Sequence, residues 1–331
     1  MLKYALIAGI ALLTFSNPSQ GQSWKDKYVQ AQDSYSKENY DQAFSLADEA
    51  LKGYLAEGTT NPENHAAILR LISTICYVQQ KLPEGLEFVK KEILLRETKK
   101  DTAYAVALMN QAQFEEQMGA NDQAVKTLLI CRPVLTQYYK ADDLRVLECD
   151  LKLAINYYFM NDYAKANEWF TPALTAVEKK QEYTEEVLEG FYYAGMLYVE
   201  TGKSNQAVTT FSKTNQIYIS ADLTKTLSYP MVLYGLAYAY HKDQSHLKAE
   251  DSYREAQSIY ENLAGKEGDN YLTILGARVV NLHYLDKQAQ ADELWNQLKK
   301  NPEGKLAYAS ACASLAAFYH RRGRAGWTWT A

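Results

Sequence analysis

One residue position recurs at a nearly constant interval along most of the chain, and this recurrence limits the possible folds more than any other feature. A small residue occurs seven times, at successive intervals of 42, 39, 42, 41, 42 and 42 residues. These reference residues are Ala43, Gly85, Ala124, Ala166, Ala207, Ala249 and Ala291. Self-similarity at a fixed period predicts a repeat architecture, in which each unit packs on its neighbours.

Two further positions keep register with the reference residues. The residue twelve positions earlier is small in every repeat except the last: Ala31, Ser73, Ala112, Ala154, Gly195, Ala237 and then Val279. The residue four positions later is mostly large and apolar: Ala47, Val89, Leu128, Phe170, Phe211, Tyr253 and Trp295. Small residues on both helices of a pair let the two backbones approach closely, so the pattern predicts tight antiparallel helix hairpins.

This pattern resembles the tetratricopeptide repeat (TPR) family over residues 24–323, most clearly in Ala249 to Leu285. The repeats exceed the usual unit of about 34 residues and resemble the longer repeats of kinesin light chains. The resemblance implies an all-α fold, a right-handed α-solenoid of about seven and a half TPR-like helix hairpins. Gly85 in place of Ala, the bulky Val279, and Glu92 at a position expected to be small depart from the family pattern.

Turn residues and apolar spacing predict the helix boundaries. Gly119 and Gly202 suit helix C-termini, and Pro83 suits a first helical turn. First helices are expected near 24–38, 65–80, 102–118, 143–160, 185–201, 227–243 and 270–285, with an eighth near 306–322. Second helices are expected near 41–56, 83–98, 121–138, 163–180, 204–219, 246–264 and 288–300.

The N-terminal residues differ from the repeats. Residues 1–21 combine Lys3, an apolar run from Tyr4 to Phe15 and small residues just before Gln22. These features predict a cleaved signal peptide and an exported protein, periplasmic or extracellular. An uncleaved N-terminal anchor helix is the alternative. No other membrane segment is expected, because no later run of about 18 residues is apolar.

The C-terminal residues break the pattern. We expect residues 22–323 to form the solenoid and residues 324–331 to form an irregular tail. The eighth hairpin has no second helix, which predicts a truncated chain or the N-terminal part of a longer protein. The alternative is that the last helix itself caps the array.

Composition and motifs exclude several classes of function. A formal net charge of -5 provides no basic field for phosphates, so no nucleic-acid partner is expected. Nucleophile, metalloprotease and phosphate-loop motifs are absent, so we expect neither enzymatic activity nor a cofactor. The four cysteines form no CxxC pair, and no metal site is expected. Cys131 and Cys149 flank a predicted turn, where core packing of free thiols is expected and a disulfide is the alternative.

The TPR resemblance implies an inner surface formed by the first helices and lined by the residues 15, 11 and 8 positions before each reference residue. These columns are rich in Tyr, which offers a broad contact area and a hydroxyl group, and they predict a groove for an extended peptide or protein segment. The predicted groove residues are Tyr28, Gln32, Arg70, Thr74, Tyr77, Met109, Asn110, Gln113, Tyr158, Tyr192, Met196, Tyr234, Tyr238, His241 and His283. The alternative is that many of these tyrosines pack between repeats.

Three of these residues carry additional hypotheses. Asn110 lies 14 positions before Ala124, where the family often has an Asn that holds a peptide backbone. Only this repeat has an Asn there, and a solvent-facing Asn is the alternative. His241 and His283 occupy equal positions in successive repeats, so they are expected to line the groove and to stack along it; a pH-sensitive or metal-binding role is the alternative. His241 and His246 are five residues apart, which does not place them on one helix face, so a metal site there is not expected.

A non-catalytic protein- or peptide-binding scaffold is therefore the leading hypothesis. The resemblance extends to exported bacterial proteins in which such repeats precede a caspase-like CHAT peptidase or a signalling domain, so a downstream domain of a longer parent chain is a further expected partner. The alternative is an exported glycan- or nutrient-binding protein that uses aromatic side chains as stacking platforms.

Overall fold

The described part of the chain is helical throughout. The computed structural model describes residues 23–58, 61–266, 268–301 and 305–321, so the predicted signal peptide and C-terminal tail lie outside it. Within these ranges the elements are α1 (Trp24–Ser36), α2 (Tyr40–Ala56), α3 (Pro62–Val78), α4 (Leu82–Arg96), α5 (Thr102–Gln117), α6 (Asn121–Tyr138), α7 (Leu144–Phe159), α8 (Tyr163–Lys180), α9 (Glu185–Glu200), α10 (Ser204–Ser220), α11 (Tyr229–Lys242), α12 (His246–Ala264), α13 (Asp269–Tyr284), α14 (Gln288–Lys300) and α15 (Lys305–Arg321). The all-α fold class is confirmed.

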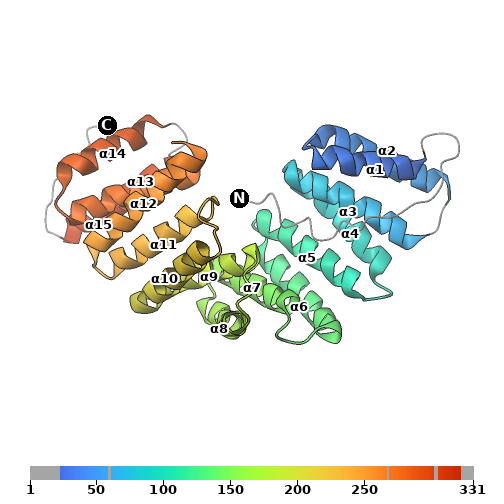
Figure 1. Cartoon of the computed structure of the whole chain (residues 1–331), viewed down its shortest axis with the longest axis horizontal. Helices are drawn as coiled ribbons and strands as arrows, with labels where there is room; N and C mark the ends of the chain where they lie inside the picture. The colour runs from blue at the N-terminus through green and yellow to red at the C-terminus, as the bar shows by residue number, and fades with distance from the viewer. Residues whose placement is uncertain (1–22, 59–60, 267, 302–304, 322–331) are drawn as a thin grey trace. The chain divides into compact units, whose positions relative to one another are not determined.

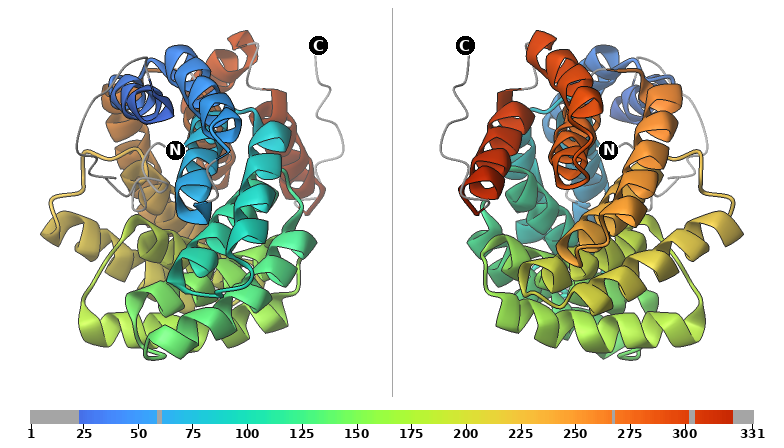
Figure 2. Two further views of the ribbon diagram at one scale, coloured as in Figure 1. Left: turned by 90° about the vertical axis from the view of Figure 1, so that its right-hand side faces the viewer. Right: turned by 90° about the vertical axis from the view of Figure 1, so that its left-hand side faces the viewer.

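The chain divides into two compact units, with the boundary inside α9 at residues 190 and 191. In the N-terminal unit, each helix from α1 to α8 packs against the next. In the C-terminal unit, α10 to α14 pack in the same sequential way, and α15 packs against α13 and α14. Figures 1 and 2 show these hairpins side by side within each unit.

The residues at the three repeating positions, namely the reference residue, the residue twelve positions before it and the residue four positions after it, form the core of the hairpins. Every reference residue is buried, and so are all residues twelve positions before and four positions after it. The predicted close approach of the two helices is therefore confirmed. Val279 also fits, since its side chain is fully buried.

Gly85 departs from the repeat pattern because an aromatic ring from the next repeat fills the space of the missing methyl group. A Cβ atom at Gly85 would lie 2.4 Å from Cε1 of Phe114 and 2.9 Å from Cβ of Cys76. Phe114 is fully buried and packs edge-on against Tyr77, with ring centroids 5.2 Å apart. The Phe114 ring thus replaces the alanine methyl group of the other repeats.

All seven hairpin turns close in the same way. The residue five positions before the reference residue is left-handed, with φ between 55° and 73°: Glu38, Gln80, Gly119, Asn161, Gly202, Gln244 and Asp286. The following N–H donates to the carbonyl oxygen five residues earlier, for example Asn39 to Ser34 at 2.9 Å and Ser245 to Tyr240 at 2.9 Å. This is the Schellman closure of a helix C-terminus. It confirms the predicted helix ends at Gly119 and Gly202.

Cys131 and Cys149 are buried free thiols, as expected for core residues. The Cys131 thiol donates to the carbonyl oxygen of Ala105 at 3.3 Å, and the Cys149 thiol to that of Leu128 at 3.8 Å. The disulfide alternative is therefore not realised.

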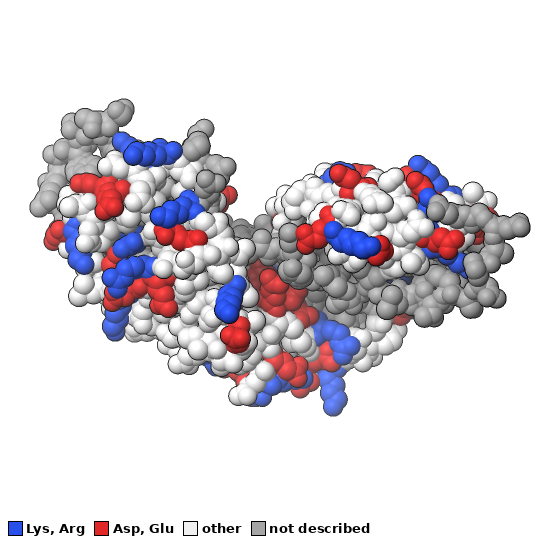
Figure 3. All heavy atoms as spheres, turned by 45° about the horizontal axis from the view of Figure 1, so that its top comes forward, with Lys and Arg blue, Asp and Glu red and all other residues white. Residues whose placement is uncertain are grey.

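The surface carries charges of both signs. On the face drawn in Figure 3, Lys and Arg side chains alternate with Asp and Glu side chains over the described part of each unit. No helix in the described ranges combines the length and apolarity needed to cross a bilayer.

Candidate binding site

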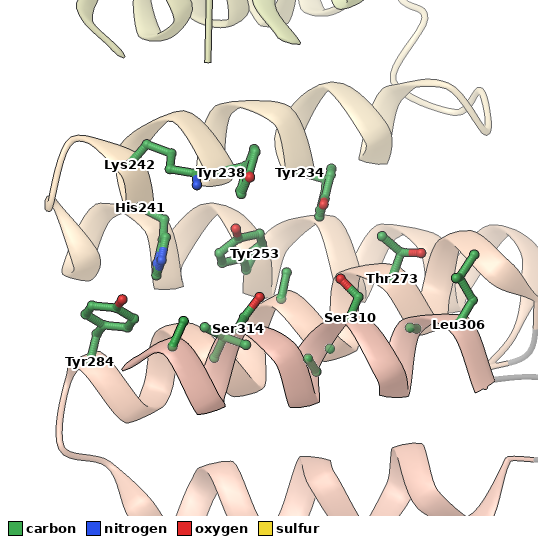
Figure 4. Close-up of a pocket in the computed structure, with 16 residues that line it drawn as sticks. Tyr234, Tyr238, His241, Lys242, Tyr253, Thr273, Tyr284, Leu306, Ser310 and Ser314 are labelled. Carbon is green, nitrogen blue, oxygen red and sulfur yellow. The ribbon is translucent and has the colours of Figure 1, made fainter. Parts of the chain in front are cut away.

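A cavity of about 580 Å³ lies within the C-terminal unit, a size typical of ligand sites. The first helices α11, α13 and α15 form its walls, and α12 contributes one tyrosine (Figure 4). The lining residues are Tyr234, Tyr238, His241, Lys242, Tyr253, Thr273, Gly276, Ala277, Val280, Tyr284, Leu306, Ala307, Ser310, Ala311, Ser314 and Ala317.

Three tyrosines form an aromatic wall of this cavity. Tyr234 and Tyr238 lie one turn apart on α11, and their rings are nearly parallel, with centroids 6.2 Å apart and an interplanar angle of 4°. The Tyr253 ring centroid lies 5.9 Å from that of Tyr234. Burial raises the pKa of Tyr253 well above its ordinary value. Tyr253 is therefore uncharged at neutral pH, and its buried ring completes the aromatic wall.

A second aromatic cluster lies at one end of the cavity. The His241 ring centroid lies 4.8 Å from that of Tyr284 and 4.9 Å from that of His246. His241 Nδ1 is 3.0 Å from Oδ1 of Asn281, whose Nδ2 donates to the carbonyl oxygen of His246 at 3.0 Å. Because the Asn281 amide nitrogen is the donor, its oxygen accepts, which assigns the proton of His241 to Nδ1.

The proximity of His241 and His246 corrects the sequence argument about them. They belong to α11 and α12 on either side of one turn, so the geometry of a single helix face does not apply. Within the described residues, no group of three or more His, Cys, Asp and Glu side chains is placed to hold a metal ion.

The two ends of the cavity differ in chemistry. Lys242, His241 and Tyr284 gather at one end, and Thr273 and Leu306 lie at the other (Figure 4). The Lys242 ammonium nitrogen is 5.1 Å from the ring centroid of Tyr238. Leu306 is 84% exposed, which leaves an apolar side chain open to solvent at the opposite end.

Small residues let α15 approach α13 along the cavity. A Cβ atom at Gly276 would lie 3.1 Å from the carbonyl oxygen of Ala307 and 3.6 Å from Cβ of Ala311. A larger residue at position 276 would push the two helices apart. Gly276 therefore sets the spacing of this wall.

The predicted groove residues of the C-terminal unit divide into three groups. Tyr234, Tyr238 and His241 come together in the cavity. Tyr192 and Met196 are partly exposed on α9, and Tyr192 packs against Phe211 with ring centroids 5.8 Å apart. His283 is buried, with Nδ1 2.8 Å from the hydroxyl oxygen of Tyr319, and so packs between helices.

Most predicted groove residues of the N-terminal unit take part in helix packing. Four are buried, namely Tyr28, Thr74, Tyr77 and Gln113, and Arg70 is held by Glu92 at 2.9 Å. Gln32, Met109, Asn110 and Tyr158 are partly exposed. Gln32 donates to the hydroxyl oxygen of Tyr28 at 3.3 Å, so this pair is also linked along α1.

The column eight positions before the reference residue links successive repeats. Tyr77 accepts from Gln113 at 3.3 Å, and Glu116 accepts from Asn156 at 2.7 Å. His241 also hydrogen-bonds the next repeat, but as the donor, from Nδ1 to Oδ1 of Asn281. These side chains therefore form hydrogen bonds to the next repeat. The periodicity of the sequence does not predict these bonds.

A buried lysine surrounded by carboxylates lies in the N-terminal unit and has no counterpart in the sequence predictions. Lys152 on α7 forms an ion pair with Glu116 at 3.3 Å. Burial alone would lower the pKa of Lys152, but the carboxylates of Glu116, Glu189 and Glu186 outweigh this effect and raise it. Lys152 therefore stays charged and holds these acidic side chains against α7.

Replacing Glu148 with glutamine is expected to raise the melting temperature at neutral pH. Burial raises the pKa of Glu148, and the charge of Glu186 adds to this, although Thr184 donates to the carboxylate at 2.8 Å. A carboxyl group whose pKa is higher in the folded state destabilises the fold when ionised, and this cost disappears as pH falls through the raised pKa. The increase in melting temperature caused by Glu148→Gln should therefore become smaller as the pH is lowered toward about 4.

Thermal unfolding of both proteins across this pH range measures the effect. Glu182→Gln, which changes an exposed carboxylate, is the control and should show little change. A Glu148→Gln variant that is less stable than the parent at neutral pH would contradict the prediction.

Sequence reasoning missed several lining residues for identifiable reasons. Tyr253 belongs to the column four positions after the reference residue, which marks core residues, yet its ring also closes the cavity. Lys242 and Tyr284 directly follow His241 and His283, the residues predicted to line the groove. Both lie at the C-terminal end of their helices and line the cavity there. Ser310 and Ser314 lie on α15, for which no reference residue exists.

Comparisons with known proteins agree with this architecture. No protein-family model matches the sequence, and no curated protein shows detectable sequence similarity to it. A tetratricopeptide repeat protein from Parabacteroides merdae superposes with a TM-score of 0.61 at 14% identity, covering 89% of this chain and 99% of that one. The fold is that of TPR-like repeat proteins.

Two other TPR-like structures extend this comparison. A putative kinesin light chain with TPR-like repeats from Podosopora anserina matches with a TM-score of 0.52 at 14% identity, covering 62% of this chain and 99% of that one. A Rap protein in complex with competence and sporulation factor matches with a TM-score of 0.56 at 13% identity, covering 89% of this chain and 80% of that one. At these identities the likeness concerns the TPR-like fold.

Proposed function

We propose that this chain is a non-catalytic scaffold whose first helices bind an extended peptide or a segment of a protein. The observation that carries the proposal is the cavity between α11, α13 and α15, with its aromatic wall of Tyr234, Tyr238 and Tyr253. Aromatic rings supply a large contact area at low entropic cost, and the hydroxyl groups beside them bind backbone amides.

The TPR-like fold supports this proposal. The Rap protein of similar fold was solved with competence and sporulation factor bound, so this architecture accommodates a binding partner in that protein. Export of the chain and a downstream domain remain predictions of the sequence.

Glycan binding is the second candidate function, and the parallel rings of Tyr234 and Tyr238 favour it. Flat aromatic faces serve as stacking platforms for sugar rings as well as for side chains. The described lining of the cavity has one basic side chain, several hydroxyl groups and no carboxylate. This composition fits peptide binding better than glycan binding, because a sugar would gain from carboxylate acceptors for its hydroxyl groups.

Binding of the full chain to a random peptide display library and to a glycan array tests the two candidates. We expect peptides to be enriched, and we expect the double variant Tyr234→Ala/Tyr238→Ala to lose about tenfold or more in affinity for them, as for removal of central aromatic contacts. Tyr240→Ala, on the same helix but outside the cavity lining, is the matched control. Selective glycan binding, or peptide binding unaffected by the double variant, would refute the proposal.

A further inference from the structure

We propose that the cavity of the C-terminal unit selects an acidic segment, with a carboxylate at the Lys242 end and an apolar side chain at the Leu306 end. This inference rests on the proposed function and names the chemical class of its ligand.

The charge of the cavity comes from one lysine. Apart from His241, Lys242 is the sole ionisable basic residue among the described lining residues, and no acidic residue lines the cavity with it. Its ammonium group lies 5.1 Å from the ring centroid of Tyr238, and this cation–π contact draws the lysine toward the aromatic wall. The Lys242 side chain forms no ion pair with any described carboxylate, so its charge is available to an anionic ligand.

The remainder of the chain makes this positive end distinctive. The formal net charge is -5, so an acidic ligand is repelled by the protein as a whole. Within the cavity, Lys242 is the group that attracts a carboxylate, and no acidic lining residue opposes it. The carboxylate of the ligand is therefore expected to bind at Lys242. A basic ligand would meet Lys242 with no carboxylate in the lining to compensate.

The middle of the cavity suits a peptide backbone. Ser310 and Ser314 on α15 carry hydroxyl groups that both donate and accept hydrogen bonds, and Thr273 on α13 adds a further hydroxyl group at the Leu306 end. Figure 4 shows Ser310 and Ser314 between the lysine end and the leucine end. An extended chain that runs between the two ends passes these hydroxyl groups.

The far end supplies apolar surface. Leu306 is 84% exposed, and the adjacent lining residue Ala307 is also apolar. Covering an exposed leucine removes apolar surface from water, which favours binding of an aliphatic or aromatic side chain. The cavity therefore has a direction, and it selects both the charge and the orientation of the ligand.

The test uses three fluorescein-labelled peptide pools with acetylated and amidated ends. In each pool, Leu residues at fixed positions alternate with Glu, Gln or Lys, and the remaining positions are randomised. Fluorescence anisotropy with the full chain measures the affinities at about 0.05 M and about 0.3 M salt. We expect the Glu pool to bind about tenfold more tightly than the Gln pool, and this preference to fall at the higher salt.

Variants assign the preference to the two ends. Lys242→Met should reduce the preference for the Glu pool to less than about threefold, and Lys242→Arg should retain it. Lys248→Met is the matched control, because Lys248 also lies over a tyrosine ring, that of Tyr240 at 5.5 Å, but does not line the cavity. Leu306→Ser should weaken all three pools by a similar factor.

The outcomes separate this inference from the proposed function. Equal binding of the three pools, preference for the Lys pool, or a preference that survives Lys242→Met would overturn the inference and leave the peptide-binding scaffold standing. Absence of binding by all three pools would overturn both.

Discussion

Replacing Glu92 with alanine is expected to lower the free energy of unfolding by about 3–5 kcal/mol, the usual cost of breaking a buried ion pair. Glu92 is fully buried on α4, where it accepts from Nε of Arg70 at 2.9 Å and from Nε of Arg96 at 3.0 Å. The side chains of Arg70 and Arg96 are only 14% and 8% exposed. Without Glu92, Arg70 and Arg96 both lose the buried carboxylate that they share.

Urea denaturation of the full chain measures this loss. Glu87→Ala is the control, because Glu87 lies on the same helix, is 64% exposed and pairs with Lys90 at the surface. Its expected effect is within about 1 kcal/mol. The double variant Arg70→Met/Glu92→Met should be less destabilised than Glu92→Ala, since it removes both charges of this buried ion pair and replaces them with apolar side chains. Equal stability of Glu92→Ala and Glu87→Ala would contradict the prediction.

Replacing Phe211 with alanine is expected to cost about 3–5 kcal/mol in the C-terminal unit. Phe211 on α10 is fully buried between two glycines, Gly195 on α9 and Gly235 on α11. A Cβ atom would lie 2.6 Å from the Phe211 ring if built at Gly195 and 2.3 Å from it if built at Gly235. The two glycines have no side chains that could fill the space, so truncation leaves a cavity.

A double-mutant cycle with Gly235→Ala makes this prediction specific. In the parent chain Gly235→Ala should cost about 1–3 kcal/mol, because the added methyl group overlaps the ring. In the Phe211→Ala background the same change should cost nothing or stabilise, since alanine favours helix by about 1 kcal/mol over glycine. Ile219→Ala, at an exposed position on α10, is the control. Additive effects of Phe211→Ala and Gly235→Ala would contradict the proposed contact.

The helices and their core faces could be predicted because the repeat signal combines many weak constraints. Ala43, Ala124 and their equivalents recur at a fixed spacing, and each is buried at the crossing of two helices. Glycine and proline near the turns placed most helix ends within a few residues of their positions in the structure. Periodicity therefore specified the hairpins and their order.

The candidate site could be predicted only in part, because its shape depends on contacts between repeats. Tyr234 and Tyr238 follow from the periodic columns, but the presence of a cavity beside them depends on how closely α15 approaches α13 at Gly276. Periodicity specifies which face of a helix turns inward and does not specify that spacing. The same limit applies to Arg70. Its position in the repeat predicts a side chain on the inner surface, but in the structure this side chain pairs with Glu92.

The shared closure of the hairpin turns has a practical consequence. Five of the seven left-handed residues carry a side chain, and all five are exposed: Glu38, Gln80, Asn161, Gln244 and Asp286. Since main-chain hydrogen bonds hold the turn, exchanging one of these exposed side chains for a fluorescent dye or a spin label leaves the closure of the turn in place. One such reporter in each of five hairpins would record the sequence in which the hairpins open under force or denaturant, hairpin by hairpin.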